Sequence, residues 1–149
     1  MLIRTHLAIA VFAILLLLSH VSNKLLFVIV VLIATFIPDI DSGFSTLGSR
    51  GIFKFLQVFT KHRGIIHSFT FCILISIILA FFFPAVAFAF FLGYAVHLFA
   101  DSFTKEGITP FWPYSRMSSG YFKTGGRVET SVFLAFIFLD MILFVIVIL

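Results

Sequence analysis

The few histidines and carboxylates of this chain fall mostly at the ends of apolar segments. The stretch IPDID carries Asp39 and Asp41, and the stretch GYAVHLFAD carries His97 and Asp101. His97 and Asp101 are four residues apart, so on a helix they lie one turn apart on the same face. Imidazole nitrogens and carboxylate oxygens together are ligands that Zn²⁺ and Mn²⁺ accept in proteins. These residue types therefore predict a metal centre if the fold brings the segments together.

Further candidates stand at the ends of other apolar segments. The stretch TKHRGIIHSFTF places His62, Arg63 and His67 immediately before a long apolar run. His6 opens the first apolar segment, and Glu129 precedes the last one. These candidates outnumber the ligands of one tetrahedral site, so two ions about 3.5 to 4 Å apart could act together on an ester.

The composition predicts a polytopic helical membrane protein of one domain spanning residues 1–149. Hydrophobic residues make up 62% of the chain and charged residues 11%, whereas a soluble domain is about half apolar and a quarter charged. The net charge of +4 comes without a basic tract. We therefore expect no nucleic-acid partner, and we expect the positive charge to meet anionic lipid headgroups. The single cysteine, Cys72, excludes a disulfide framework and is expected to be a small core residue.

Five apolar segments are expected to form an all-α transmembrane bundle. They are residues 7–18, 25–37, 69–83, 85–103 and 131–149. A helix needs about 20 residues to cross the hydrocarbon core, so the last two segments qualify and the first three need flanking residues. The first two could instead form a re-entrant pair, but we favour spans.

The connections between these segments have their own patterns. Pro84 separates the third and fourth segments so closely that they must form a helical hairpin. Residues 38–66 and 104–128 are long polar connections. We expect a short interfacial helix at residues 52–59, and we expect Trp112 to anchor the second connection at the membrane surface.

The distribution of basic residues predicts the orientation in the cell membrane. Nine of the ten lysines and arginines lie before the first segment or in the two long connections, and only Lys24 lies on the other side. This asymmetry places the N-terminus and both connections in the cytoplasm and the C-terminus outside. The residues SHVSN after the first segment contain no small-x-small cleavage site, so we expect a retained span. Every candidate ligand then lies at the cytoplasmic end of its helix, and only His20 and Asp140 lie elsewhere.

Each candidate has a simpler interpretation when it is taken alone. His62 could be a headgroup neighbour, and Arg63 could anchor at headgroups or hold a substrate phosphate. His97 and Asp101 could be an interhelical hydrogen-bonding pair without metal, and IPDID could be a helix stop. The convergence of all these groups at one membrane face favours the metal centre, because independent structural uses would not select the same face on every helix.

The combined motifs resemble a known family. They are Thr5 and His6; IPDID followed by Ser42; HRGIIHS; GYAVHLFAD; and Thr104, Gly107 and the FWP of residues 111–113. The combination resembles the YdjM-type family of membrane-bound metal-dependent hydrolases, also described as LexA-binding, inner-membrane-associated hydrolases, over most of the chain. The pattern is similar, more distantly, to zinc-dependent phospholipase C and its nuclease relatives, which hints at a phosphoester substrate.

The resemblance implies roles for the individual residues. Five would be the principal metal ligands: His6, Asp39, His67, His97 and Asp101. His62, Asp41 and Glu129 would be further ligands, partners that orient a ligand, or general bases. Arg63 would hold the anionic leaving group, Ser68 would add a hydrogen bond, and Gly64 would allow close backbone approach.

We therefore expect a hydrolase that uses one or two Zn²⁺ or Mn²⁺ ions and cleaves a phosphoester of a membrane lipid or lipid-linked substrate at the cytoplasmic leaflet. A transporter or metal carrier is one alternative, but it needs polar groups through the thickness of the membrane, and only Asp140 lies in mid-segment. A non-catalytic membrane scaffold is the other alternative. In that case the histidines could be replaced without loss of bound metal or activity.

Overall fold

The computed structural model describes residues 1–41 and 65–148. In this part of the chain five α-helices follow one another: α1 (Ile3–Leu17), α2 (Lys24–Phe36), α4 (Phe69–Phe82), α5 (Pro84–Ser102) and α6 (Arg127–Ile148). Two short 3₁₀ segments, η1 (Leu18–His20) and η2 (Ile37–Asp41), extend α1 and α2. The described residues form no strand and only two isolated bridges, so the predicted all-α class is confirmed. The interfacial helix expected at residues 52–59 lies outside the described residues.

Three helical stretches are long and apolar enough to cross a membrane: Ile3–His20, Pro84–Ser102 and Arg127–Val147. The first reaches this length because its helix begins before the apolar run and continues through η1. The helices α2 and α4 have 13 and 14 residues, or about 20 Å at 1.5 Å per residue. They are shorter than a hydrocarbon core of about 30 Å. These lengths are compatible with a helical membrane bundle whose members differ in span.

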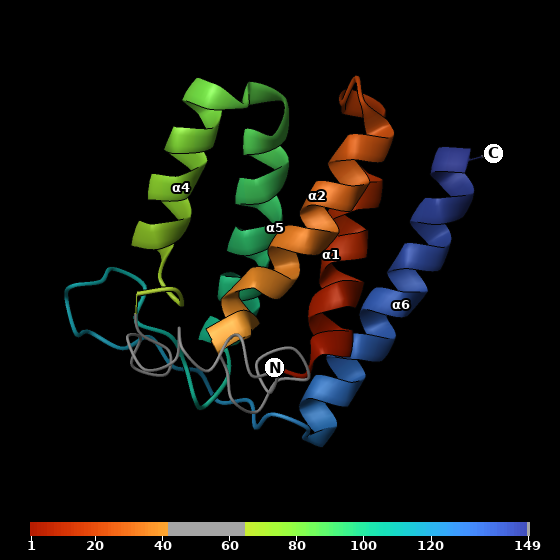
Figure 1. The fold of residues 1–149 in the computed structure, drawn as a ribbon. Helices are drawn as coiled ribbons and strands as arrows, with labels where there is room; N and C mark the ends of the chain where they lie inside the picture. The colour runs from red at the N-terminus through yellow and green to blue at the C-terminus, as the bar shows by residue number, and fades with distance from the viewer. Residues whose placement is uncertain (42–64, 149) are drawn as a thin grey trace.

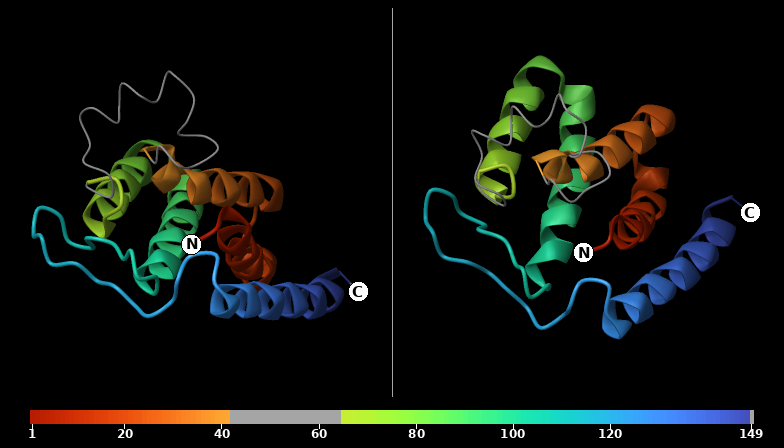
Figure 2. Two further views of the ribbon diagram at one scale, coloured as in Figure 1. Left: turned by 90° about the horizontal axis from the view of Figure 1, so that it is seen from below. Right: turned by 60° about the horizontal axis from the view of Figure 1, so that its bottom comes forward.

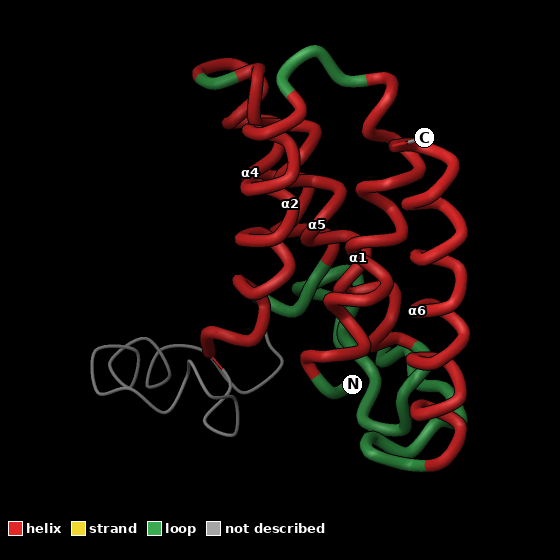
Figure 3. Tube along the Cα trace, turned by 90° about the vertical axis from the view of Figure 1, so that its right-hand side faces the viewer, coloured by secondary structure: helices red, strands yellow, loops and turns green. Residues whose placement is uncertain are grey.

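The five helices lie side by side, as Figure 1 shows. The α1–α2 and α4–α5 connections lie at one end of the bundle, and the N-terminus and residues 104–126 lie at the other. We call the latter the loop end (Figure 3). The first residues of α1, α4 and α6 and the last residues of α2 and α5 meet there. This alternation brings ligands that are far apart in sequence to one end of the bundle.

The helix α5 is the centre of the bundle and packs against α1, α2 and α4. Its contact with α2 is close at Gly93, where a Cβ atom would lie 2.3 Å from the main-chain oxygen of Val31. Only glycine fits this approach. Tyr94 and Leu98 of α5 are fully buried beside Cys72, which is a core residue as expected.

The helix α6 lies against α1 at the edge of the bundle (Figure 2). Phe12 and Phe136 meet edge to face with ring centroids 5.4 Å apart, and the guanidinium of Arg4 lies 5.2 Å from the ring centroid of Phe133. The helix begins at Arg127, four residues before the expected start at residue 131. Glu129 therefore belongs to its first turn instead of preceding it.

The connection after α5 is fixed to the bundle by main-chain hydrogen bonds. Ile108 and Ser118 exchange two of them, at 2.9 and 2.8 Å, and the side chain of Ile108 is buried in the core. Gly107 turns the chain there with φ of 60°, a conformation that favours glycine. The main-chain oxygen of Pro110 accepts from the amide of Phe69 at 2.8 Å. The connection is thus joined to α4 as well as to α5.

Candidate metal centre

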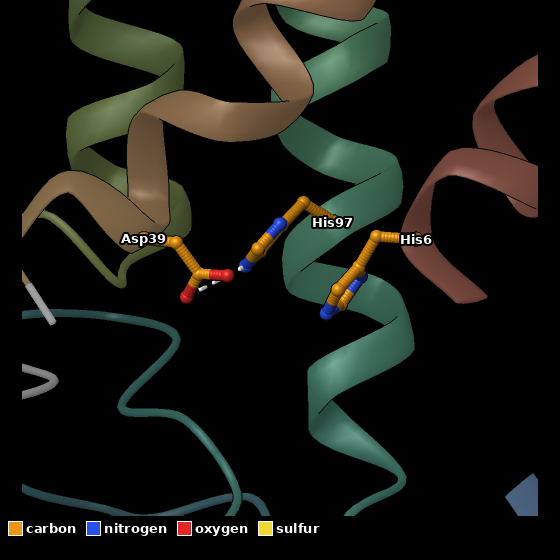
Figure 4. A group of neighbouring side chains, drawn as sticks. All are labelled: His6, Asp39 and His97. Carbon is orange, nitrogen blue, oxygen red and sulfur yellow. Dashed lines mark ion pairs between the residues drawn. The ribbon is translucent and has the colours of Figure 1, made fainter. Parts of the chain in front are cut away.

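Five side chains gather at the loop end from four parts of the chain. His6 comes from α1, Asp39 from η2, His67 from the residues before α4, and His97 and Asp101 from α5. They form two groups in which one donor atom of each residue lies within 4.8 Å of the others: His6, Asp39 and His97; and His67, His97 and Asp101. Figure 4 shows the first group, with its three side chains reaching from different elements toward one space. The structure thus brings together all five residues that were expected to be principal ligands.

The distances within the cluster fit ligands arranged around an ion. His97 Nε2 lies 3.8 Å from Asp39 Oδ1 and 3.8 Å from Asp101 Oδ2, and His67 Nε2 lies 3.8 and 3.9 Å from the same two oxygens. These separations are too long for hydrogen bonds. Two ligands that each lie about 2.1 Å from one ion are separated by about 3.4 to 4.2 Å. The spacings are therefore those that ligands around one ion would have.

His97 is oriented by the backbone of the neighbouring helix. Its Nδ1 lies 2.8 Å from the main-chain oxygen of Thr35 in α2. A carbonyl oxygen only accepts, so Nδ1 must carry the proton and Nε2 must carry the lone pair. Nε2 is buried and makes no hydrogen bond with any residue that the structure describes. This arrangement would suit metal coordination by Nε2, because a partner behind the ring fixes its orientation.

His6 completes the case that the residues present fit a metal ion. Its side chain is fully buried, and neither ring nitrogen makes a hydrogen bond within the described residues; the 3.3 Å approach of Nε2 to Asp101 Oδ1 does not reach hydrogen-bond geometry. Its ring stacks on that of His97 with centroids 3.9 Å apart. Buried polar atoms without partners cost free energy. An ion that accepted these lone pairs would remove that cost.

The carboxylates supply the negative charge of the cluster. Burial raises the pKa of Asp39, although His6 and His67 oppose the shift. Asp101 is almost fully buried, and in this structure it pairs with the α-ammonium group of Met1. Asp39 has 20% of its side chain exposed, against 2% or less for its partners His67 and His97. Asp39 is therefore on the side of the cluster that solvent reaches.

Glu129 lies beside the cluster but belongs to neither group. One carboxylate oxygen accepts from the amide of Leu2 at 2.6 Å and from the hydroxyl of Thr5 at 2.9 Å, and the other accepts from the amide of Gly125 at 2.6 Å. These bonds join the start of α6 to the start of α1, next to His6. Of the roles considered from the sequence, this geometry favours a partner that positions a ligand.

Other residues hold the segment before α4. Ser68 accepts from the amide of Phe71 at 3.2 Å, as a helix cap, and donates to the main-chain oxygen of Ile65 at 2.5 Å. The hydroxyl of Tyr94 donates to the main-chain oxygen of Ile66 at 2.6 Å. These contacts flank His67 and fix its backbone. The hydroxyl of Ser68, expected to bond a substrate, is therefore engaged within this segment.

The remaining predicted residues divide into two groups. His62 and Arg63 lie outside the described residues, as do Ser42, Gly64 and the side chain of Asp41. Asp140 lies in the middle of α6, away from the cluster. Its Oδ1 is buried and has no hydrogen-bond partner among the described residues.

Sequence reasoning missed Thr35 and Tyr94. Thr35 acts through its main-chain oxygen, which every residue type possesses, so its identity carries no signal. Tyr94 lies three residues before His97 within GYAVHLFAD, and its position on the ligand-bearing helix was the available signal.

The chain matches the family model described as YdjM inner membrane protein over residues 1–149. No curated protein and no solved structure gives a significant match. A match over the whole length shows the family, and the three apolar helices long enough to cross a bilayer agree with its description. The chain therefore belongs to the YdjM family of inner membrane proteins.

Proposed function

We propose that this protein is a metal-dependent hydrolase of the inner membrane that cleaves a phosphoester of a lipid or lipid-linked substrate. One observation carries the proposal: three imidazoles and two carboxylates from four parts of the chain gather in one cluster, and all but Asp39 are buried. Ionisable groups within membrane helices are costly and usually functional. His6, His97 and Asp101 lie on helices long and apolar enough to cross a membrane. Their gathering with two further ionisable groups is difficult to explain by independent structural uses.

The donor set suits Zn²⁺ or Mn²⁺. His6, Asp39, His67, His97 and Asp101 would hold it, and five residues are enough for one ion or for two that share ligands. A bound ion would supply Lewis acidity toward a phosphoryl oxygen and would lower the pKa of water.

The residues of the chain would prepare the centre for this chemistry. The Thr35 oxygen keeps the proton of His97 on Nδ1, so Nε2 stays available as a ligand. Glu129 holds the first turn of α1, and with it the backbone beside His6. Asp39 marks the side from which a substrate would approach, because it is the partly exposed member of the cluster. From that side it is also the carboxylate best placed to accept a proton from water.

The position of the cluster supports a lipid substrate. It lies at the loop end of α1 and α5, both of which are long and apolar enough to cross a membrane. In a membrane crossed by α1 and α5, this end of the bundle would lie near the phosphates of one leaflet. A lipid or lipid-linked phosphate would reach the cluster from that leaflet without leaving the membrane.

The test compares two histidine substitutions in the full chain, purified in detergent and loaded with zinc or manganese. His97→Gln removes a proposed ligand, and His20→Gln makes the same change in η1 at the opposite end of the bundle. We expect wild type and His20→Gln to retain bound metal and to hydrolyse a chromogenic phosphodiester, and we expect His97→Gln to lose both. Equal metal content in the two variants, or none in wild type, would discard the proposal.

A further inference from the structure

A second site lies at the loop end, outside the candidate metal centre. It is a pocket of about 850 Å³ between the first turn of α4 and the connection that follows α5. Its walls include Thr70, Phe111, Trp112, Tyr114, Arg116 and Met117. This volume is in the range of small-molecule pockets. None of these residues takes part in the metal cluster.

The pocket is held in place by the main chain on two sides. The hydrogen bonds between Ile108 and Ser118 close the base of the loop that carries the aromatic residues, and Ile108 is buried in the core. The main-chain oxygen of Pro110 accepts from Phe69 at 2.8 Å and from Thr70 at 3.4 Å. The wall from α4 and the wall from the loop are thus joined directly, so the pocket is present before a ligand binds.

The chemistry of the lining is apolar with one cation. Phe111, Tyr114 and Met117 are each more than half exposed, and Trp112 is 44% exposed. Aromatic residues at the ends of membrane helices lie at the level of the headgroups. Arg116 is exposed and forms no ion pair with any residue that the structure describes. A guanidinium in this position is suited to bind a phosphate with two parallel hydrogen bonds.

We propose that this pocket binds an anionic phospholipid, with the phosphate on Arg116 and an acyl chain along Phe111, Trp112 and Met117. The apolar wall favours a lipid over a soluble anion, and the single cation favours an anionic lipid over a neutral one. The inference rests on the proposed function, because it takes the bound lipid to be the substrate. The pocket includes Thr70, three residues after His67, so a lipid held there lies next to a segment that carries a proposed metal ligand.

The experiment uses Trp112, the single tryptophan of the chain, as its reporter. The full chain, stripped of metal with a chelator, is placed in phosphatidylcholine nanodiscs that contain phosphatidylglycerol or phosphatidylcholine with brominated acyl chains. Bromine quenches indole fluorescence at short range. We expect the brominated phosphatidylglycerol to quench Trp112 at lower mole fractions than the brominated phosphatidylcholine does.

Two variants test the role of the charge. One basic residue at a membrane surface contributes about fivefold to binding of an anionic lipid, so Arg116→Gln should weaken the preference for phosphatidylglycerol by about that factor. Arg127→Gln makes the same change at an exposed residue of the loop end that is not part of the pocket, and it should keep the preference.

Equal quenching by the two lipids in wild type would overturn the inference, and so would an unchanged preference in Arg116→Gln. Relief of quenching by excess inorganic phosphate would identify a free-anion site and would overturn the lipid assignment. Because the protein is free of metal, lipid binding is measured apart from catalysis. Normal quenching of the metal-free protein, together with no phosphodiester hydrolysis by the metal-loaded protein, would reject the proposed function and retain the lipid site.

Discussion

The Nδ1 atom of His97 lies 2.8 Å from the main-chain oxygen of Thr35. This contact ties the proposed ligand on α5 to the backbone of α2. The ring nitrogen that carries the proton of the neutral imidazole is therefore set by how closely the two helices approach. The approach is set one turn earlier, where Gly93 meets Val31. The hydroxyl of Thr35 donates to the Val31 oxygen at 2.8 Å and also lies 3.4 Å from the Gly93 oxygen. The packing of α2 on α5 and the orientation of His97 are therefore one structural feature.

Gly93→Ala should disturb both packing and metal binding. The new Cβ would lie 2.3 Å from a main-chain oxygen that cannot rotate away, so α2 must move and carry the Thr35 oxygen with it. Overpacking of this kind costs about 1–3 kcal/mol. We expect a lower unfolding temperature in detergent and weaker zinc binding in a competition titration. Ala135→Val, which adds carbon at an exposed position of α6, is the control. Unchanged zinc affinity in Gly93→Ala would show that the orientation of His97 does not depend on the α2–α5 contact.

Two aspartates allow the metal centre to be distinguished from a transport path. Asp101→Asn removes a charge from the cluster, and Asp140→Asn makes the same change in the middle of α6. We expect zinc affinity to fall by about tenfold or more in Asp101→Asn and to stay at the wild-type value in Asp140→Asn, as measured by competition with a fluorescent chelator. Zinc flux into proteoliposomes that requires Asp140 and tolerates Asp101→Asn would instead support a transporter.

The sequence predicted the cluster of three histidines and two aspartates better than it predicted the contacts that support it. His97 and Asp101 were recognisable because a spacing of four residues fixes their shared face. His6, Asp39 and His67 could be assigned to the same end because apolar segments alternate in direction across a membrane. The supporting contacts were not visible, because Thr35, Leu2 and Gly125 act through main-chain atoms that no residue type reveals.

The start of α6 shows a second limit of the sequence. Arg127, Val128 and Glu129 are not a continuous apolar run, so hydropathy placed the helix start at residue 131. The structure begins the helix at Arg127, where the Glu129 carboxylate accepts from the amide of Gly125 before the first turn. A carboxylate near a helix N-terminus is favourable, but this effect is too small to be read against the hydropathy pattern.

Glu129→Ala should separate a positioning role from a ligand role. The change removes three hydrogen bonds to a charged group, each worth about 1.5–3 kcal/mol, and it leaves the amides of Leu2 and Gly125 without their acceptor. We expect a clear drop in unfolding temperature and a loss of α6 packing on α1. Faster tryptic cleavage after Arg127 would report the lost packing. Zinc affinity should fall less than in His97→Gln, because Glu129 lies in neither ligand group. Glu129→Gln should recover part of the stability, since its amide oxygen still accepts. If Glu129→Ala loses zinc as completely as His97→Gln while the fold stays intact, Glu129 is a ligand, and its bonds to α1 are secondary.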